Sequence, residues 1–237
     1  MKLETKNFYK TVGALVLPIA LQNLINVAVT SADVVMLGRV GETVLSGSSL
    51  AGQVQFVLTL FLFGLTSGAA VLTAQYWGKK DMRTIEKVMG IAFRFSIIVS
   101  VIFLLAVQIF PAQVMSIFTP EQPVIDEGVK YLRIVSFTYL LCAVTQVYLN
   151  VMRSVERVVI ATVTYSVSLI VNIVINGILI FGLLGFPRLG IVGAAIGTLI
   201  ARIVEVLIVV VYAKTKSILN FKLRDLFVRD KLYSRTL

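Results

Sequence analysis

Six apolar stretches, each long enough to cross a lipid bilayer, constrain this chain more than any other feature of its sequence. A transmembrane helix needs about 20 predominantly apolar residues. Window hydropathy indicates spans at about 12–37, 50–76, 88–110, 129–152, 159–181 and 191–213. Only 14% of the residues are charged, against about 25% in a soluble domain. We therefore expect an all-α integral membrane protein, with a six-helix transmembrane lobe at 1–213 and a basic tail at 214–237.

The cationic residues are distributed unevenly between the segments that connect these spans. Sixteen of the 22 Lys and Arg lie in the N-terminal segment, the 77–87 and 153–158 loops and the tail. The loops between them hold only Arg39 and Arg188. Because cation-rich loops stay in the cytoplasm, both termini of this multi-pass chain are predicted to be cytoplasmic, with the protein in the cell membrane. The net charge of +10 then reflects loops facing anionic lipid, and no nucleic-acid partner is expected.

The first span carries polar residues that a simple membrane anchor does not need. They follow helical steps of four, four and three, which places them on one face: Gln22, Asn26, Thr30 and Asp33. A polar stripe that ends in a carboxylate should face protein or water. Asp33 is therefore either a site for a coupling cation or a residue that caps the helix end near Arg39. Pro18 removes a helix hydrogen bond, so we also expect a bend there.

Two later spans contain polar pairs about one helical turn apart. In the fifth span, Asn172 and Asn176 can hydrogen-bond to the same guest, or they can join neighbouring helices instead. In the sixth span, Arg202 and Glu205 can neutralise each other inside the membrane. We interpret this second pair as structural in preference to a transport site.

Pairs of glycines four residues apart occur in the second and sixth spans. They are Gly64 with Gly68, and Gly193 with Gly197. This spacing lets two transmembrane helices approach closely, because no side chain separates their backbones. We therefore expect close helix packing at both pairs.

The chain lacks the residues that several kinds of protein chemistry require. The chain has no histidine and only one cysteine, Cys142, so imidazole-based catalysis, an internal disulfide and a structural zinc site are not expected. No glycine-rich loop ends in Gly-Lys-Ser or Gly-Lys-Thr, so no nucleotide is expected to drive the protein. The sequence therefore indicates neither an enzyme nor a cofactor or resident metal.

Several stretches, in this order and spacing, resemble the multidrug and toxic compound extrusion (MATE) family. They are Leu17–Ala20, Ala32–Arg39, Gln75–Lys79, Met152–Ser154, Asn172–Asn176, Phe181–Gly182 and Gly190–Ala195. The resemblance implies a lobe of a transporter with twelve spans in two six-helix lobes, which exchanges substrate for protons or sodium by alternating access. It covers only the N-terminal lobe, so 214–237 is a tail or an inter-lobe linker. The expected partner is a C-terminal lobe or a second half-transporter.

The resemblance also implies roles for individual residues. Asp33 matches the acidic residue implicated in cation coupling, with H⁺ or Na⁺ as the ion, and Pro18 matches a proline at which the helix bends. Asn172 and Asn176 match polar positions of the fifth helix. An archaeal branch has an aspartate at the position of Asn176, so one carboxylate of that pair is missing here. Further positions match polar residues that line the same lobe: Tyr131, Gln146 and Thr198.

The leading hypothesis is a cation-coupled antiporter that exports organic or drug-like cations. A carboxylate at mid-membrane costs about 2.5–3.5 kcal/mol on insertion scales, and a bound cation removes this cost. One alternative is a lipid-linked saccharide flippase of the same superfamily, which would need a more cationic cleft. A second alternative is a membrane subunit without transport activity, in which Asp33, Asn172 and Asn176 could become apolar without consequence.

Overall fold

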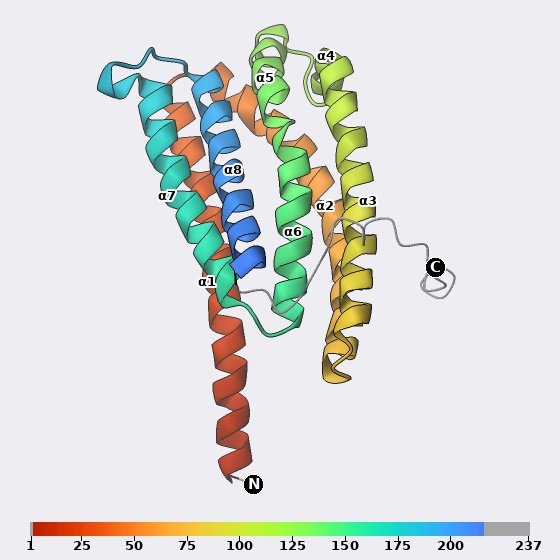
Figure 1. Ribbon diagram of the computed structural model, residues 1–237. Helices are drawn as coiled ribbons and strands as arrows, with labels where there is room; N and C mark the ends of the chain where they lie inside the picture. The colour runs from red at the N-terminus through yellow and green to blue at the C-terminus, as the bar shows by residue number, and fades with distance from the viewer. Residues whose placement is uncertain (1, 216–237) are drawn as a thin grey trace.

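The computed structural model describes residues 2–215, apart from the side chains of residues 2–12, 14, 15 and 26. Most of the predicted tail, from residue 216, therefore lies outside the described residues. The described chain forms helices and no strands (Figure 1). The helices are α1 (Lys2–Gly38), α2 (Glu42–Gly78), α3 (Met82–Ile109), α4 (Pro111–Ser116), α5 (Gln122–Val135), α6 (Thr138–Ser154), α7 (Val159–Phe181), the 3₁₀ helix η1 (Leu183–Gly185) and α8 (Ile191–Thr215).

The long helices form a bundle whose connections alternate between its two ends. Five helices are long and apolar enough to cross a membrane, and there are six spans if α5 and α6 count as one. The α2–α3 and α6–α7 connections lie at the same end as the start of α1 (Figure 1). The loops predicted to be cytoplasmic from their cations therefore do share one end of the bundle. The chain is an all-α multi-pass membrane protein, as the sequence predicted.

The first helix begins well before the apolar stretch from which a transmembrane span was predicted. Its apolar part starts at Val16, whereas the helix starts at Lys2. Hydropathy reports the segment that lipid can cover, and a helix can extend beyond the bilayer into water. The helix continues through Pro18 without interruption. The bend expected at this proline stays a prediction.

The fourth predicted span, 129–152, is two helices instead of one. The direction of the helix axis changes by 53° between α5 and α6. Pro123 does not break α5 but lies in its first turn, where a missing N–H is tolerated. The break falls at Ser136 and Phe137, where neither glycine nor proline marks it. A side chain of α3 supports the break, because Gln108 Nε2 donates to the Arg133 carbonyl and to Ser136 Oγ, both at 2.8 Å.

The two glycine pairs behave differently. At Gly193, an added Cβ would lie 2.7 Å from the Leu179 carbonyl of α7, and at Gly197 it would overlap the Asn176 side chain. Close packing of α7 and α8 is therefore confirmed. At Gly64 and Gly68 an added Cβ would meet nothing within 4 Å in residues 2–215, so the close packing predicted there is wrong for the helices that the structure describes. The four-residue spacing shows where an approach is possible, but neighbouring helices determine whether it happens.

Candidate functional site

A cavity of about 730 Å³, lined by both polar and apolar side chains, lies among six helices of the bundle. Because apolar side chains surround these helices, polar groups gathered on one cavity wall indicate a binding site. Six of the predicted residues line the cavity: Thr30, Asp33, Tyr131, Gln146, Asn172 and Thr198. Thr30, Asp33 and Asn172 were predicted from helical spacing, and Tyr131, Gln146 and Thr198 from the family resemblance; the six share one cavity.

Asp33 is held by a residue of another helix. Asn176 Nδ2 of α7 donates a hydrogen bond of 2.6 Å to Asp33 Oδ1 of α1. The Asn176 side chain is fully buried, and its oxygen lies against Gly197 of α8. The carboxylate thus makes no hydrogen bond or ion pair with Arg39 among the described residues, in contrast to the capping alternative considered from the sequence.

Two buried amide oxygens of α7 lack a hydrogen-bond partner among the described residues, 2–215: Asn172 Oδ1 and Asn176 Oδ1. A buried carbonyl without a partner is costly, and either a metal cation or a proton on the carboxylate can satisfy such a group. Carboxylate and carbonyl oxygens are also the ligands that hard cations prefer. The carboxylate of Asp33 and the amide oxygens of Asn172 and Asn176 are therefore of the chemical kind that binds either Na⁺ or a proton.

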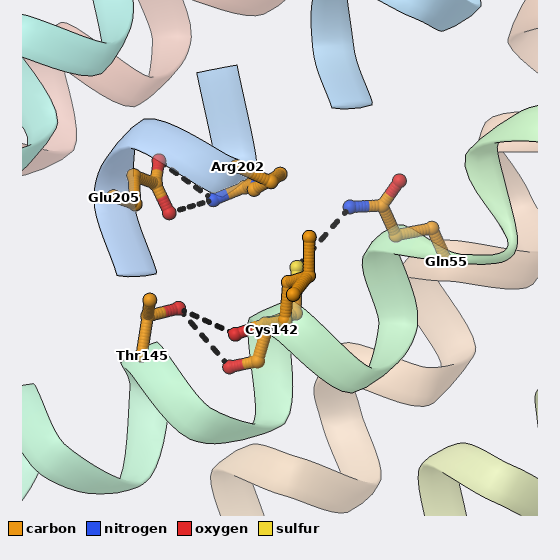
Figure 2. Close-up of polar contacts among 6 residues, drawn as sticks. Gln55, Cys142, Thr145, Arg202 and Glu205 are labelled. Atoms are coloured by element: carbon orange, nitrogen blue, oxygen red, sulfur yellow. Dashed lines mark hydrogen bonds and ion pairs between the residues drawn. The ribbon is translucent and has the colours of Figure 1, made fainter. Parts of the chain in front are cut away.

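The second charged feature of the cavity is the pair formed by Arg202 and Glu205. Nη1 of Arg202 donates to both carboxylate oxygens of Glu205, at 3.0 and 2.8 Å (Figure 2). The structure thus confirms the ion pair predicted from the spacing, but both residues also line the cavity. Beside this pair, Gln55 Nε2 lies 3.9 Å from the buried Cys142 thiol (Figure 2).

Among the predicted residues whose side chains are described, Gln22, Asn176 and Pro18 are not part of the cavity wall. Gln22 is buried nearer the start of α1, where Gln22 Nε2 donates to Thr162 Oγ1 at 2.9 Å and Gln22 Oε1 accepts from Arg153 Nη2 at 2.5 Å. It belongs to a network that joins α1, α6 and α7. The side chain of Asn26 lies outside the described residues, so its role stays a prediction.

The sequence analysis missed the contribution of α2 to the cavity. Its cavity face follows steps of four, three and four: Ser48, Gly52, Gln55 and Thr59. This is the same helical periodicity that drew attention to the first span, so the signal was present. Cys142, Tyr165 and Ser168 also line the cavity, and the helical steps of three and four from Tyr165 through Ser168 to Asn172 place these residues of α7 on one face.

A helical bundle around a polar intramembrane cavity, with a carboxylate and an ion pair on its wall, defines a class of multi-pass membrane protein rather than one family. The MatE family matches residues 18–178, which is more than half of the chain, and the chain belongs to that family.

Relatives and solved structures agree with this assignment. The chain is 24% identical over 216 residues to the probable multidrug resistance protein YoeA of Bacillus subtilis, covering 91% of this chain and 47% of the relative. It is 28% identical over 177 residues to the probable multidrug resistance protein NorM of Rhizobium meliloti, covering 74% of this chain and 38% of the relative.

A structure described as the outward-facing conformation of a multidrug resistance MATE family transporter matches with a TM-score of 0.84 and 20% identity. That match covers 96% of this chain and 50% of the solved chain. It shows that the two share a fold over that region. The chain spans about half the length of the curated relatives it matches, or somewhat less.

Proposed function

We propose that this chain is the N-terminal lobe of a cation-coupled exporter of organic cations. The observation that carries the proposal is Asp33, a carboxylate on the wall of an intramembrane cavity, held by Asn176 beside amide oxygens without partners. The names of the relatives, probable multidrug resistance proteins, support the substrate class. The cations on one end of the bundle support a cell-membrane protein with cytoplasmic termini.

The charges of the cavity favour exchange of one cation for another. Glu205 is neutralised by Arg202, which leaves Asp33 as the one carboxylate among the cavity residues without a cationic partner in hydrogen-bond contact. A proton or Na⁺ and an organic cation would compete for it. Coupling then requires that the two ligands stabilise different conformations of the lobe, because a ligand with equal affinity for both conformations shifts nothing. The second six-helix lobe, or a second half-transporter, would complete the pathway.

The two alternatives predict different charge requirements. A flippase for anionic lipid-linked saccharides should have a cavity with excess positive charge, whereas here the single cavity arginine already faces a glutamate. A subunit without transport would not depend on a cavity carboxylate at all. Both alternatives therefore predict that neutralising Asp33 leaves cation binding and export unchanged.

The test is the Asp33→Asn variant, which removes the charge and keeps the shape. We expect the variant to reach the membrane at the normal level but to bind a fluorescent organic cation about tenfold more weakly or worse, because one charge-assisted contact is lost. Binding is measured by fluorescence anisotropy with the chain in lipid nanodiscs. Transport activity is measured as export of the same dye from intact cells.

The matched control is Asp126→Asn, which removes an exposed carboxylate at the start of α5, remote from the cavity wall. It should leave dye binding unchanged. Titrating the wild-type chain with Na⁺ at constant pH, and with protons at constant Na⁺, identifies the competing ion. If Asp33→Asn binds and exports the dye as well as wild type, the role of Asp33 proposed here is wrong.

A further inference from the structure

The Arg202–Glu205 pair is asymmetric in its exposure. The side chain of Glu205 is 2% exposed, whereas that of Arg202 is 28% exposed. The carboxylate therefore stays buried in the wall while the guanidinium reaches the cavity. A pair that served only to neutralise two charges would not need to present one of them to the cavity space.

Most of the hydrogen-bonding capacity of Arg202 is unused. A guanidinium has five N–H donors in a planar fork, and Glu205 takes only those of Nη1. Within residues 2–215, neither Nε nor Nη2 of Arg202 makes a hydrogen bond. Both atoms keep some exposed surface, unlike Nε of Arg153, which is buried without a partner. A planar donor edge of this kind matches a carboxylate, which can accept two parallel hydrogen bonds from it.

The free edge of Arg202 lies at a defined level relative to Asp33. Asn176, which holds Asp33, packs against Gly197, and Thr198 of the next position lines the cavity. Arg202 follows Thr198 by four residues, so it lies on the same face about 6 Å further along α8. The cavity thus offers an anionic wall group and, roughly one turn away, a cationic donor edge.

We propose that Arg202 is a specificity-determining residue that binds the carboxylate of a substrate whose cationic group lies at Asp33. The preferred substrates of this lobe are then zwitterionic organic molecules, rather than simple cations. The inference rests on the proposed function, because it assigns a substrate class to the same cavity. Glu205 has a positioning role: it fixes the guanidinium through Nη1 and directs the remaining donors toward the cavity.

The experiment compares two probes that differ in one charge. One is a rhodamine dye with a free carboxylate, and the other is its methyl ester, which keeps the cation but has lost the acid. Both are titrated against the chain in lipid nanodiscs by fluorescence anisotropy. We expect the wild-type chain to bind the acid about tenfold more tightly than the ester, since a hydrogen bond between two charged groups is worth more than one to a neutral acceptor.

The variant of choice is the double substitution Arg202→Gln with Glu205→Gln. It leaves no unpaired charge buried in the wall, and it keeps the net charge of the cavity. We expect it to lose the preference for the acid while binding the ester as wild type does. Arg202→Lys, which keeps the charge but not the planar fork, should retain only part of the preference. Thermal unfolding of each variant in nanodiscs verifies that the lobe is intact.

The outcomes separate this inference from the proposed function. The inference fails if the wild-type chain binds both probes equally, or if the double substitution weakens the binding of both probes by the same factor. Either result would mean that Arg202 does not bind the carboxylate, whereas the proposed cation binding at Asp33 would stand. If the wild-type chain binds neither probe, the proposed function fails and the inference falls with it.

Discussion

At the scale of single residues, Asn176 links the three helices that form the Asp33 site. Its amide nitrogen donates to Asp33 of α1, and its oxygen lies against the Cα of Gly197 on α8. The side chain is fully buried, so it cannot move aside into open space. The position of the Asp33 carboxylate therefore depends on a glycine two helices away, which has no side chain of its own.

The Gly197→Ala variant tests this dependence. The new methyl group would overlap the Asn176 side chain, and we expect a loss of about 1–3 kcal/mol in the free energy of unfolding, typical of overpacking. It should also weaken binding of the fluorescent cation, because Asn176 can no longer hold Asp33. The matched control is Gly64→Ala, where an added Cβ meets nothing within 4 Å. Equal stability and equal dye affinity in the two variants would show that Asn176 adapts freely and that Gly197 does not position it.

At the scale of helices, hydropathy located the spans well where one apolar stretch corresponds to one helix. The fifth span was predicted at 159–181 and is α7 with the same bounds, and the sixth differs from α8 only at its C-terminal end. The break between α5 and α6 was not predictable in this way. The residue that completes it, Gln108, lies 28 positions before Ser136, and hydropathy within one window carries no information about such a partner.

The same reasoning explains which parts of the site the sequence predicted. The steps from Gln22 to Asp33 define a face of α1, and Asp33 and Thr30 do line the cavity. Periodicity cannot tell how far along the helix the cavity extends, so Gln22 was grouped with them although it bonds to Arg153 and Thr162. Burial of Glu205 behind Arg202 depends on six helices meeting around one space. No spacing within a single helix contains that information.

The Gln108→Leu variant tests whether a distant side chain stabilises the helix break. Gln108 satisfies the Arg133 carbonyl that the break frees, and leucine has nearly the same size but no donor. We expect the variant to lose about 0.5–1.5 kcal/mol in the free energy of unfolding, the net value of a hydrogen bond, because the Arg133 carbonyl is exposed and also accepts from Ser136 Oγ at 3.4 Å. Thermal unfolding in nanodiscs measures the loss. Gln113→Leu on the exposed face of α4 is the control, and an equal effect in the two variants would mean that water replaces Gln108 at no cost.

At the scale of the whole molecule, the described bundle has most of its apolar surface on the outside, as a chain in lipid should. Of the 18-residue window that qualifies α1 as a span, only 12% is buried within the bundle. Cavity residues of α1 and α2 such as Thr30, Ser49 and Gln53 are nevertheless exposed and polar, and lipid is a poor environment for them. This exposed polar surface is where we propose that the second lobe or a second half-transporter faces this one.

The predicted orientation of the bundle in the membrane can be tested without changing the cationic residues. In a Cys142→Ala background, Gln75→Cys places a thiol at the end of α2 and Gln113→Cys places one on α4, at opposite ends of the bundle. Because both replaced residues are neutral, the charge asymmetry that orients the chain is preserved. We expect a membrane-impermeant maleimide to label Gln113→Cys in intact cells and Gln75→Cys only after permeabilisation. The reverse pattern would place the cation-rich loops outside the cell and would overturn the proposed cytoplasmic position of the termini, whereas the Asp33 cavity would be unaffected.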